Sequence, residues 1–151
     1  MKTFSQINTH IVFAVRHRER SIPPEHKEEV HRLITGIVTN KGQKLLAINS
    51  MPDHIHLLTG LTAVVAPSDL VRDIKANSSR LINERGWTRD RFRWQEGFGA
   101  FSYSRSQIPM IARYIENQER HHATRSFSSE VETILNAYDI DYDERDLPRI
   151  L

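Results

Sequence analysis

Cysteine is absent from this chain of 151 residues, which excludes disulfides, thiolate zinc sites, iron–sulfur clusters and a cysteine nucleophile. Long apolar runs are also missing near the N-terminus, where the five residues from Ile11 to Val15 are followed by Arg16. That run is too short for the core of a signal peptide or for a membrane span. We therefore expect a cytoplasmic protein with no membrane partner.

Internal repeats, low-complexity tracts and Gly/Ser linkers are absent as well. The length fits one domain, since domains commonly hold about 100–200 residues. The composition, 38% hydrophobic and 26% charged, is that of an ordinary globular protein. We expect a single domain over residues 1–151 that ends in an acidic helix or tail at about residues 128–151.

Charge is distributed unevenly, although the net charge is only +2. From Glu130 onward seven acidic residues accompany only two basic ones, a net charge of −5, whereas the preceding residues carry +7. Arginine supplies 16 of the 21 basic residues, and its guanidinium binds phosphate in a bidentate manner and stacks on bases. This asymmetry favours a polyanionic partner, with a solvated charged surface as the alternative.

The hydrophobic periodicity predicts alternating strands and helices. Strands are expected at residues 7–16, 44–49, 54–61 and 92–104, and helices at about residues 23–40, 67–84, 106–122 and 128–137. The first six elements follow the order of the ferredoxin-like (RRM-like) fold, an α+β antiparallel sheet with helices on one face. The helix after the fourth strand is additional and has to pack elsewhere.

The third predicted strand carries two histidines, His54 and His56, separated by Ile55. Side chains alternate along a strand, so the two imidazoles share one face while Ile55 points to the other. Two imidazoles on one face can bind a single metal ion, although two solvated histidines are the simpler interpretation.

The predicted helix at 106–122 places Tyr114 and Gln118 four residues apart, on one face. By itself this is compatible with an ordinary helix that packs one tyrosine. Together with the two histidines, Gln118 suggests a divalent metal site. A carboxamide oxygen and two imidazoles are ligands for a divalent cation and add no negative charge. Such a site would keep the ion's charge for a phosphodiester, and Tyr114 would lie where a nucleophile belongs.

Four segments resemble the single-tyrosine HUH transposases of insertion sequences, whose close relatives are the REP-associated tyrosine transposases. Residues 51–58 (MPDHIHLL) resemble the HUH motif, and residues 114–122 (YIENQERHH) resemble the tyrosine helix. Residues 94–102 (WQEGFGAFS) and, more loosely, residues 8–13 (NTHIVF) also resemble segments of that family. The likeness covers nearly the whole chain in the family's order.

The resemblance implies that His54, His56 and Gln118 hold one magnesium or manganese ion. Tyr114 would attack the scissile phosphate of single-stranded DNA, which gives a 5′-phosphotyrosine and a free 3′-OH that can later rejoin strands. The family recognises DNA hairpins at element ends. Its members are homodimers in which the tyrosine helix completes the partner's histidine pair.

A free tyrosine has a pKa near 10, so at neutral pH another group has to ease its deprotonation. The sequence shows no evident general base for this step. Asp53 precedes His54 and should therefore face away from it, as a turn residue. His121 and His122 either lie near the site or cap the C-terminus of their helix, and we favour capping.

Basic residues interleave with Trp87, Phe92 and Trp94, as in proteins that bind single strands. We expect the aromatic residues to be in the core and the basic ones to contact DNA, with Lys75, Arg80, Arg91 and Arg93 as candidates. Gly97 and Gly99 suggest a bulge or a close neighbour such as DNA. Two alternatives to the transposase remain, a non-catalytic ferredoxin-like module that binds single-stranded nucleic acid and a hydrolase in which Tyr114 only packs.

Overall fold

The computed structural model describes residues 1–16, 22–122 and 125–147. The chain divides into two compact units, residues 1–116, here called the core unit, and residues 117–151, here called the C-terminal unit. Each unit is described by itself, and residues 148–151 of the predicted acidic tail lie outside the described residues. No helix within the described ranges is long and apolar enough to cross a membrane.

The core unit is built on a four-stranded antiparallel sheet with the order β2-β3-β1-β4. Its strands are β1 (Ile7–Ala14), β2 (Lys44–Met51), β3 (His54–Leu61) and β4 (Gly99–Tyr103). The turn between β2 and β3 is the Pro52–Asp53 connection, and the central strands β1 and β3 pair with Val12 opposite His56. The α+β fold class predicted from the sequence is confirmed.

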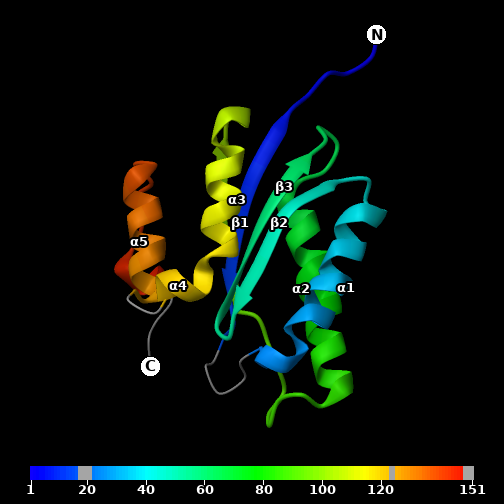
Figure 1. Cartoon of the computed structure of the whole chain (residues 1–151), viewed down its shortest axis with the longest axis vertical. Coiled ribbons are helices and arrows are strands. Elements are labelled where there is room, and N and C mark those ends of the chain that lie inside the picture. Colours follow the sequence, from blue (N-terminus) through cyan, green and yellow to red (C-terminus); the bar gives the residue numbers. More distant parts are fainter. Residues whose placement is uncertain (17–21, 123–124, 148–151) are drawn as a thin grey trace. The chain divides into compact units, whose positions relative to one another are not determined.

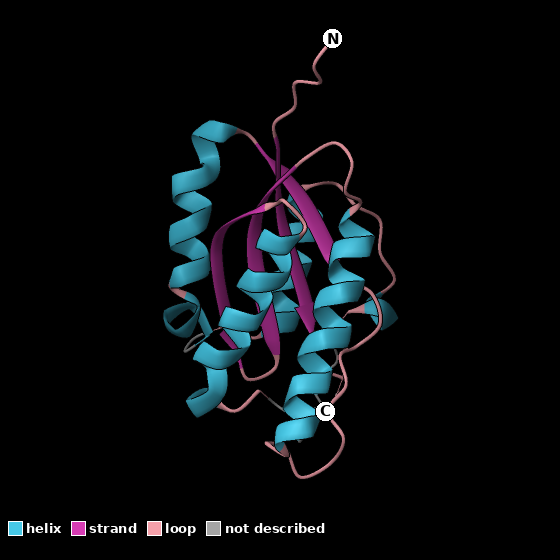
Figure 2. Cartoon of the chain, turned by 90° about the vertical axis from the view of Figure 1, so that its right-hand side faces the viewer, coloured by secondary structure: helices cyan, strands magenta, loops and turns pink. Residues whose placement is uncertain are grey.

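Two helices, α1 (Lys27–Asn40) and α2 (Pro67–Arg85), cover one face of the sheet (Figures 1 and 2). A short 3-10 turn, Pro24–His26, precedes α1, and Gly86 ends α2 in the left-handed conformation that glycine adopts without strain. The main apolar core lies between these helices and the sheet. Ile55 and Leu57 of β3 are fully buried in it, together with Ile11 and Phe13 of β1.

The helix that carries Tyr114, α3 (Ile108–Glu116), packs on the opposite face of the sheet (Figure 1). Its apolar stripe is strongly one-sided, and Ile111 and Ile115 bury against Ala47 of β2 and Leu58 of β3. The capping box of Ser104 and Gln107 fixes the preceding 3-10 turn, Arg105–Gln107. The additional helix therefore occupies the face that α1 and α2 leave uncovered.

The prediction of one continuous helix over residues 106–122 is wrong. The helical hydrogen bonding stops at Glu116, and a separate short helix, α4 (Gln118–His122), begins after Asn117. The side-chain amide of Asn49 on β2 supplies a reason, because it donates to the carbonyls of Ile115 (3.0 Å) and Glu116 (3.2 Å). In a continuous helix those carbonyls would accept from backbone amides four residues later.

The C-terminal unit contains α4 and α5 (Phe127–Ala137), followed by a 3-10 turn, Glu144–Asp146. Ser126 caps α5 by accepting a hydrogen bond from the backbone amide of Ser129 (3.2 Å). The predicted helix at 128–137 is thus present. The fourth predicted strand is shorter than expected, since only Gly99–Tyr103 of residues 92–104 is regular strand.

Candidate active site

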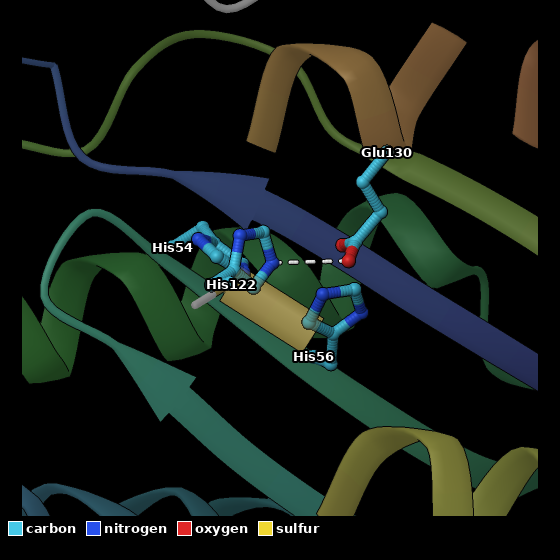
Figure 3. Close-up of side chains that lie close together, drawn as sticks. All are labelled: His54, His56, His122 and Glu130. Atoms are coloured by element: carbon cyan, nitrogen blue, oxygen red, sulfur yellow. Dashed lines mark ion pairs between the residues drawn. The ribbon is translucent and has the colours of Figure 1, made fainter. Parts of the chain in front are cut away.

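The two histidines of β3 lie on the face of the sheet that α3 covers. Their ring centroids are 5.1 Å apart with the planes at 80°, and both side chains are fully buried (Figure 3). Ile55 between them points into the main core on the other face, as strand alternation requires. The prediction that the pair shares one face is confirmed, and the alternative of two solvated histidines is not what the structure shows.

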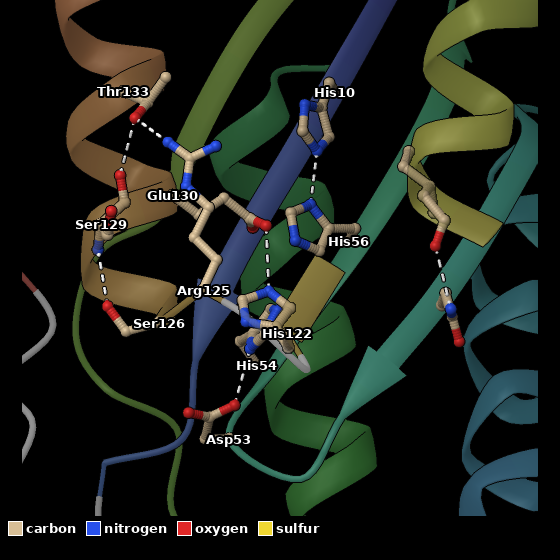
Figure 4. A network of polar contacts seen from close by, with 12 residues as sticks. His10, Asp53, His54, His56, His122, Arg125, Ser126, Ser129, Glu130 and Thr133 are labelled. Atoms are coloured by element: carbon tan, nitrogen blue, oxygen red, sulfur yellow. Dashed lines mark hydrogen bonds and ion pairs between the residues drawn. The ribbon is translucent and has the colours of Figure 1, made fainter. Parts of the chain in front are cut away.

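Asp53 contacts His54 directly, with 2.7 Å between the carboxylate Oδ1 and the ring Nδ1 (Figure 4). The prediction that Asp53 faces away from His54 is wrong, because Asp53 belongs to the turn and strand alternation begins only at His54. An ionised carboxylate can only accept a hydrogen bond, so Nδ1 of His54 carries the proton and donates it. In a neutral ring of this tautomer, Nε2 is the nitrogen with the lone pair.

His56 is held by His10 of β1 in a corresponding way. Nε2 of His10 is 2.7 Å from Nδ1 of His56, and both rings are buried (Figure 4). The ring centroids are 5.0 Å apart, with the planes inclined by 19°. In both members of the histidine pair Nδ1 is therefore the nitrogen in contact with a neighbour, Asp53 for His54 and His10 for His56.

Tyr114 of α3 lies next to this group within the same core unit. Its ring centroid is 6.0 Å from that of His56 and 6.5 Å from that of His10, and its plane is nearly perpendicular to both. The side chain is partly exposed, whereas both imidazoles are buried. The structure thus brings three of the four predicted site residues together, namely His54, His56 and Tyr114.

The fourth, Gln118, is the first residue of α4 and belongs to the C-terminal unit. It does not share one uninterrupted helix with Tyr114, so the four-residue spacing no longer implies a shared helix face. In the same unit Nε2 of His122 lies 3.0 Å from a carboxylate oxygen of Glu130 (Figure 3). His122 therefore pairs with α5. The side chain of His121 lies outside the described residues, and a capping role for His122 stays a prediction.

A family model described as "Transposase IS200 like" matches residues 3–118, well over half of the chain. The chain belongs to the IS200-like transposase family. Both halves of the candidate site, the histidine pair and the tyrosine, lie within the matched range.

Individual relatives agree with the family assignment. The transposase is 25% identical over 120 residues to the ISDra2 transposase TnpA of Deinococcus radiodurans, an alignment that covers 75% of this chain and 84% of the relative. A crystal structure of a candidate transposase from the same organism matches with a TM-score of 0.59 and 26% identity, over 78% of this chain and 98% of that one. A REP-associated tyrosine transposase bound to a REP hairpin shares the fold, with a TM-score of 0.64 and 16% identity, over 100% of this chain and 97% of that one.

Two residues that support the candidate site, His10 and Asn49, were not assigned from the sequence. His10 contacts His56, and Asn49 donates to the carbonyls at the end of α3. His10 was an unexplained histidine in a predicted strand, and Asn49 was the last residue of another. Both share the face of His56, because Asn49 pairs with His56 directly and His10 pairs with its neighbour Leu58. The available signal was a polar residue on an otherwise apolar strand.

The aromatic residues of the basic segment belong to the core of the transposase, as predicted. Phe92 and Trp94 are buried, and Trp87 packs against the same cluster. The side-chain amide of Asn83 on α2 donates to the carbonyl of Phe92 and accepts from its backbone N–H. The indole N–H of Trp94 donates to the hydroxyl of Ser78 (2.9 Å). Because Phe92 and Trp94 alternate with Arg91 and Arg93 in this segment, both arginines are exposed.

The four predicted DNA-binding residues of the transposase differ in their surroundings. Arg80, Arg91 and Arg93 are exposed and form no ion pair with any other described residue. Lys75 instead donates to the carbonyls of Gln95 (2.8 Å) and Gly97 (2.6 Å), and burial lowers the pKa of its ammonium group. Lys75 therefore has a structural part in the loop before β4, while the DNA contact of all four stays a prediction.

Gly97 in the loop before β4 and Gly99 at the start of β4 are both explained by contacts or backbone geometry within the protein. Gly97 precedes β4 and adopts a φ of +84°, which side chains rarely tolerate. A Cβ on Gly99 would lie 2.8 Å from the Phe101 ring and 2.9 Å from Cγ1 of Val12. The close neighbour that we expected at Gly99 is thus the protein itself.

Proposed function

We propose that this transposase cleaves and rejoins single-stranded DNA with Tyr114 as the nucleophile. The observation that carries the proposal is the position of the Tyr114 ring, 6.0 Å from His56 in a single compact unit. A partly exposed phenol beside a buried histidine pair, on a protein of this family, has the arrangement that a phosphotyrosine mechanism needs.

We further propose that His54 and His56 bind one divalent ion, magnesium or manganese, with Gln118 as a third ligand. The donor chemistry fits, because the Asp53 carboxylate holds Nδ1 of His54 and thereby presents Nε2 in the form that binds metals. A divalent ion bound there would polarise the scissile phosphate and ease departure of the 3′ oxygen. Gln118 rests on the family resemblance alone.

The proposed chemical step is the one that the family resemblance implies, and the residues of the chain can support it. Oη of Tyr114 forms a bond to phosphorus after losing its proton to solvent, and the bond from phosphorus to the 3′ oxygen breaks. The 3′ oxygen takes up a proton and becomes a free hydroxyl. The phosphodiester energy is kept in the 5′-phosphotyrosine, so that a 3′-OH can reverse the step without ATP.

The proposed substrate is a DNA hairpin with a single-stranded flank. The hairpin-bound relative with the same fold supports a hairpin partner, and the exposed Arg80, Arg91 and Arg93 supply positive charge for the backbone. We also propose a homodimer in which the tyrosine helix completes the partner's histidine pair, as the family resemblance implies.

The dimer proposal has a direct complementation test. A mixture of His54→Ala and Tyr114→Phe subunits regains activity if the tyrosine acts on its partner's site, since one site of the mixed dimer is then intact. If the tyrosine acts within its own chain, every site keeps one defect and the mixture stays inactive.

The mechanism is tested with a single-stranded hairpin labelled at its 3′ end, magnesium and a denaturing gel. We expect a labelled covalent adduct that is lost in Tyr114→Phe and kept in the matched variant Tyr103→Phe, whose ring lies 6.2 Å from His10. Cleavage that survives in Tyr114→Phe without an adduct would indicate a hydrolase. Binding without any cleavage would indicate the non-catalytic module.

A further inference from the structure

His10 of β1 has no place in the mechanism above, although its side chain is only 1% exposed. It is a polar residue in the centre of the sheet, and the rings of Phe101, Tyr103 and Tyr114 surround it at centroid distances of 6.2 to 6.5 Å. Burying an imidazole costs free energy unless its nitrogens are hydrogen-bonded. Its position therefore calls for an explanation in terms of the groups that it contacts.

The contact that matters joins Nε2 of His10 to Nδ1 of His56 at 2.7 Å. One nitrogen has to donate and the other to accept, and for neutral rings this choice sets the tautomer of both. If His56 donates from Nδ1, its Nε2 carries the lone pair. If His10 donates instead, the proton of His56 is on Nε2, which cannot then bind a metal.

His54 provides the comparison within the same site. Its Nδ1 faces the carboxylate of Asp53, an obligate acceptor, so its tautomer is fixed with the proton on Nδ1. The two histidines thus use the same nitrogen for the supporting contact, one toward Asp53 and the other toward His10. A pair that binds one ion through equivalent atoms requires both Nδ1 groups to be donors.

We propose that His10 is a positioning residue that accepts a hydrogen bond from Nδ1 of His56 and so fixes the tautomer and the ring orientation of that metal ligand. This inference rests on the proposed function, since it assigns His56 to a metal site. The supporting pair is asymmetric in charge: Asp53 brings a carboxylate to His54, whereas His10 brings a neutral acceptor to His56. Asp53 and His10 together therefore add one negative charge next to the proposed metal site, not two.

The experiment compares His10→Gln with His10→Met, two side chains of similar shape. The amide oxygen of glutamine can take the place of Nε2 as an acceptor, whereas methionine offers only a weak thioether acceptor. The matched control is His31→Met. His31 bonds Ser50 at 2.8 Å, and Ser50 pairs with Ile55, whose side chain lies in the core on the other face of the sheet. Thermal unfolding of each variant shows that it is folded.

The first readout is the tautomer of His56 in the metal-free protein, measured by the 15N shifts of its ring at a pH where the ring is neutral. We expect the proton on Nδ1 in the wild type and in His10→Gln, and a shift toward Nε2 in His10→Met. A wild type with the proton on Nε2, or a His10→Met variant with the wild-type tautomer, would overturn the proposal.

The second readout is the affinity for Mn²⁺, measured by calorimetric titration. Loss of such supporting contacts typically weakens metal binding about 10–100-fold, so we expect this loss in His10→Met, recovery in His10→Gln and no change in His31→Met. Equal affinity of His10→Met and the wild type refutes the role of His10 alone. A wild type that binds no Mn²⁺ refutes the proposed metal site itself, and the two failures are thereby distinguished.

Discussion

The ring of Tyr114 stands perpendicular to that of His56, at 89° and with 6.0 Å between centroids, and both residues belong to the same chain and the same compact unit. Helix α3 brings them together by packing on the sheet face that the ferredoxin-like helices leave uncovered. Within one chain the fold thus brings a phenol beside the histidine pair, and in the proposed homodimer the same helix would serve the partner's pair instead.

Removal of His54 tests the division between chemistry and DNA binding. His54→Ala should abolish cleavage and leave hairpin binding intact, because the imidazole is fully buried while the exposed arginines are unchanged. A gel-shift assay with the folded variant measures binding. Loss of binding together with cleavage would contradict the assignment of His54 to a metal site.

The contact of Asp53 with His54 predicts a graded effect on metal affinity. Asp53→Ala removes the acceptor for Nδ1 of His54 and should weaken Mn²⁺ binding about 10–100-fold, as is usual for such supporting groups. Asp53→Asn keeps an acceptor oxygen but no charge, so its affinity for Mn²⁺ should lie between that of the wild type and that of Asp53→Ala. Calorimetric titration provides the measurement, and an Asp53→Ala variant with wild-type affinity would show that the contact is incidental.

Asn49 is expected to hold the end of the tyrosine helix. Asn49→Ala deprives the carbonyls of Ile115 and Glu116 of their side-chain donor and should lower the free energy of unfolding by about 1–3 kcal/mol. Asn49→Asp should be no more stable than Asn49→Ala, since a carboxylate has no hydrogen to donate.

Urea unfolding measures the Asn49 effect, with Asn77→Ala as the control. Asn77 donates to Asp73 within α2 (2.8 Å), far from α3 in sequence, and its loss should cost less. Full stability of Asn49→Asp would mean that the amide does not anchor the helix.

Lys75 predicts a dependence of stability on pH. Burial lowers the pKa of its ammonium group in the folded state from the ordinary value of 10.5, with a smaller opposing effect of Glu96. Between the two pKa values the unfolded chain holds more protons, so this group makes the free energy of unfolding rise with pH. The free energy of the wild type minus that of Lys75→Met should therefore increase as the pH approaches 10.5. A constant or falling difference in urea unfolding would contradict the burial of a charged Lys75.

The exposed arginines predict a change in the salt dependence of DNA binding. If Arg91 and Arg93 each contact a phosphate of a single strand, the double alanine variant should reduce the slope of log K against log salt by ~1.4. Arg72→Ala is the control, because Arg72 is already paired with Asp69 at 3.2 Å. An unchanged slope in the double variant would place the DNA elsewhere.

Much of this architecture follows from the sequence, because strand alternation and helical periodicity determine which side chains share a face. The face of His54 and His56 could be predicted in this way, since Ile55 between them requires burial in the opposite core. The break at Asn117 could not be predicted, because its cause is a side chain on β2, far away in sequence. The sequence indicates the turn at Asp53 but not the direction of its side chain, and the contact of His10 depends on strand register, which the local pattern does not specify.

The covalent bond between Tyr114 and DNA can be located by mass spectrometry of the trypsin-digested adduct. Trypsin releases Tyr114 in the peptide YIENQER, residues 114–120, and Tyr103 in the peptide WQEGFGAFSYSR, residues 94–105. After nuclease trimming, we expect a nucleotide mass on YIENQER that requires a divalent metal ion and disappears in His54→Ala. Modification of the Tyr103 peptide, or cleaved DNA with neither peptide modified, would contradict it.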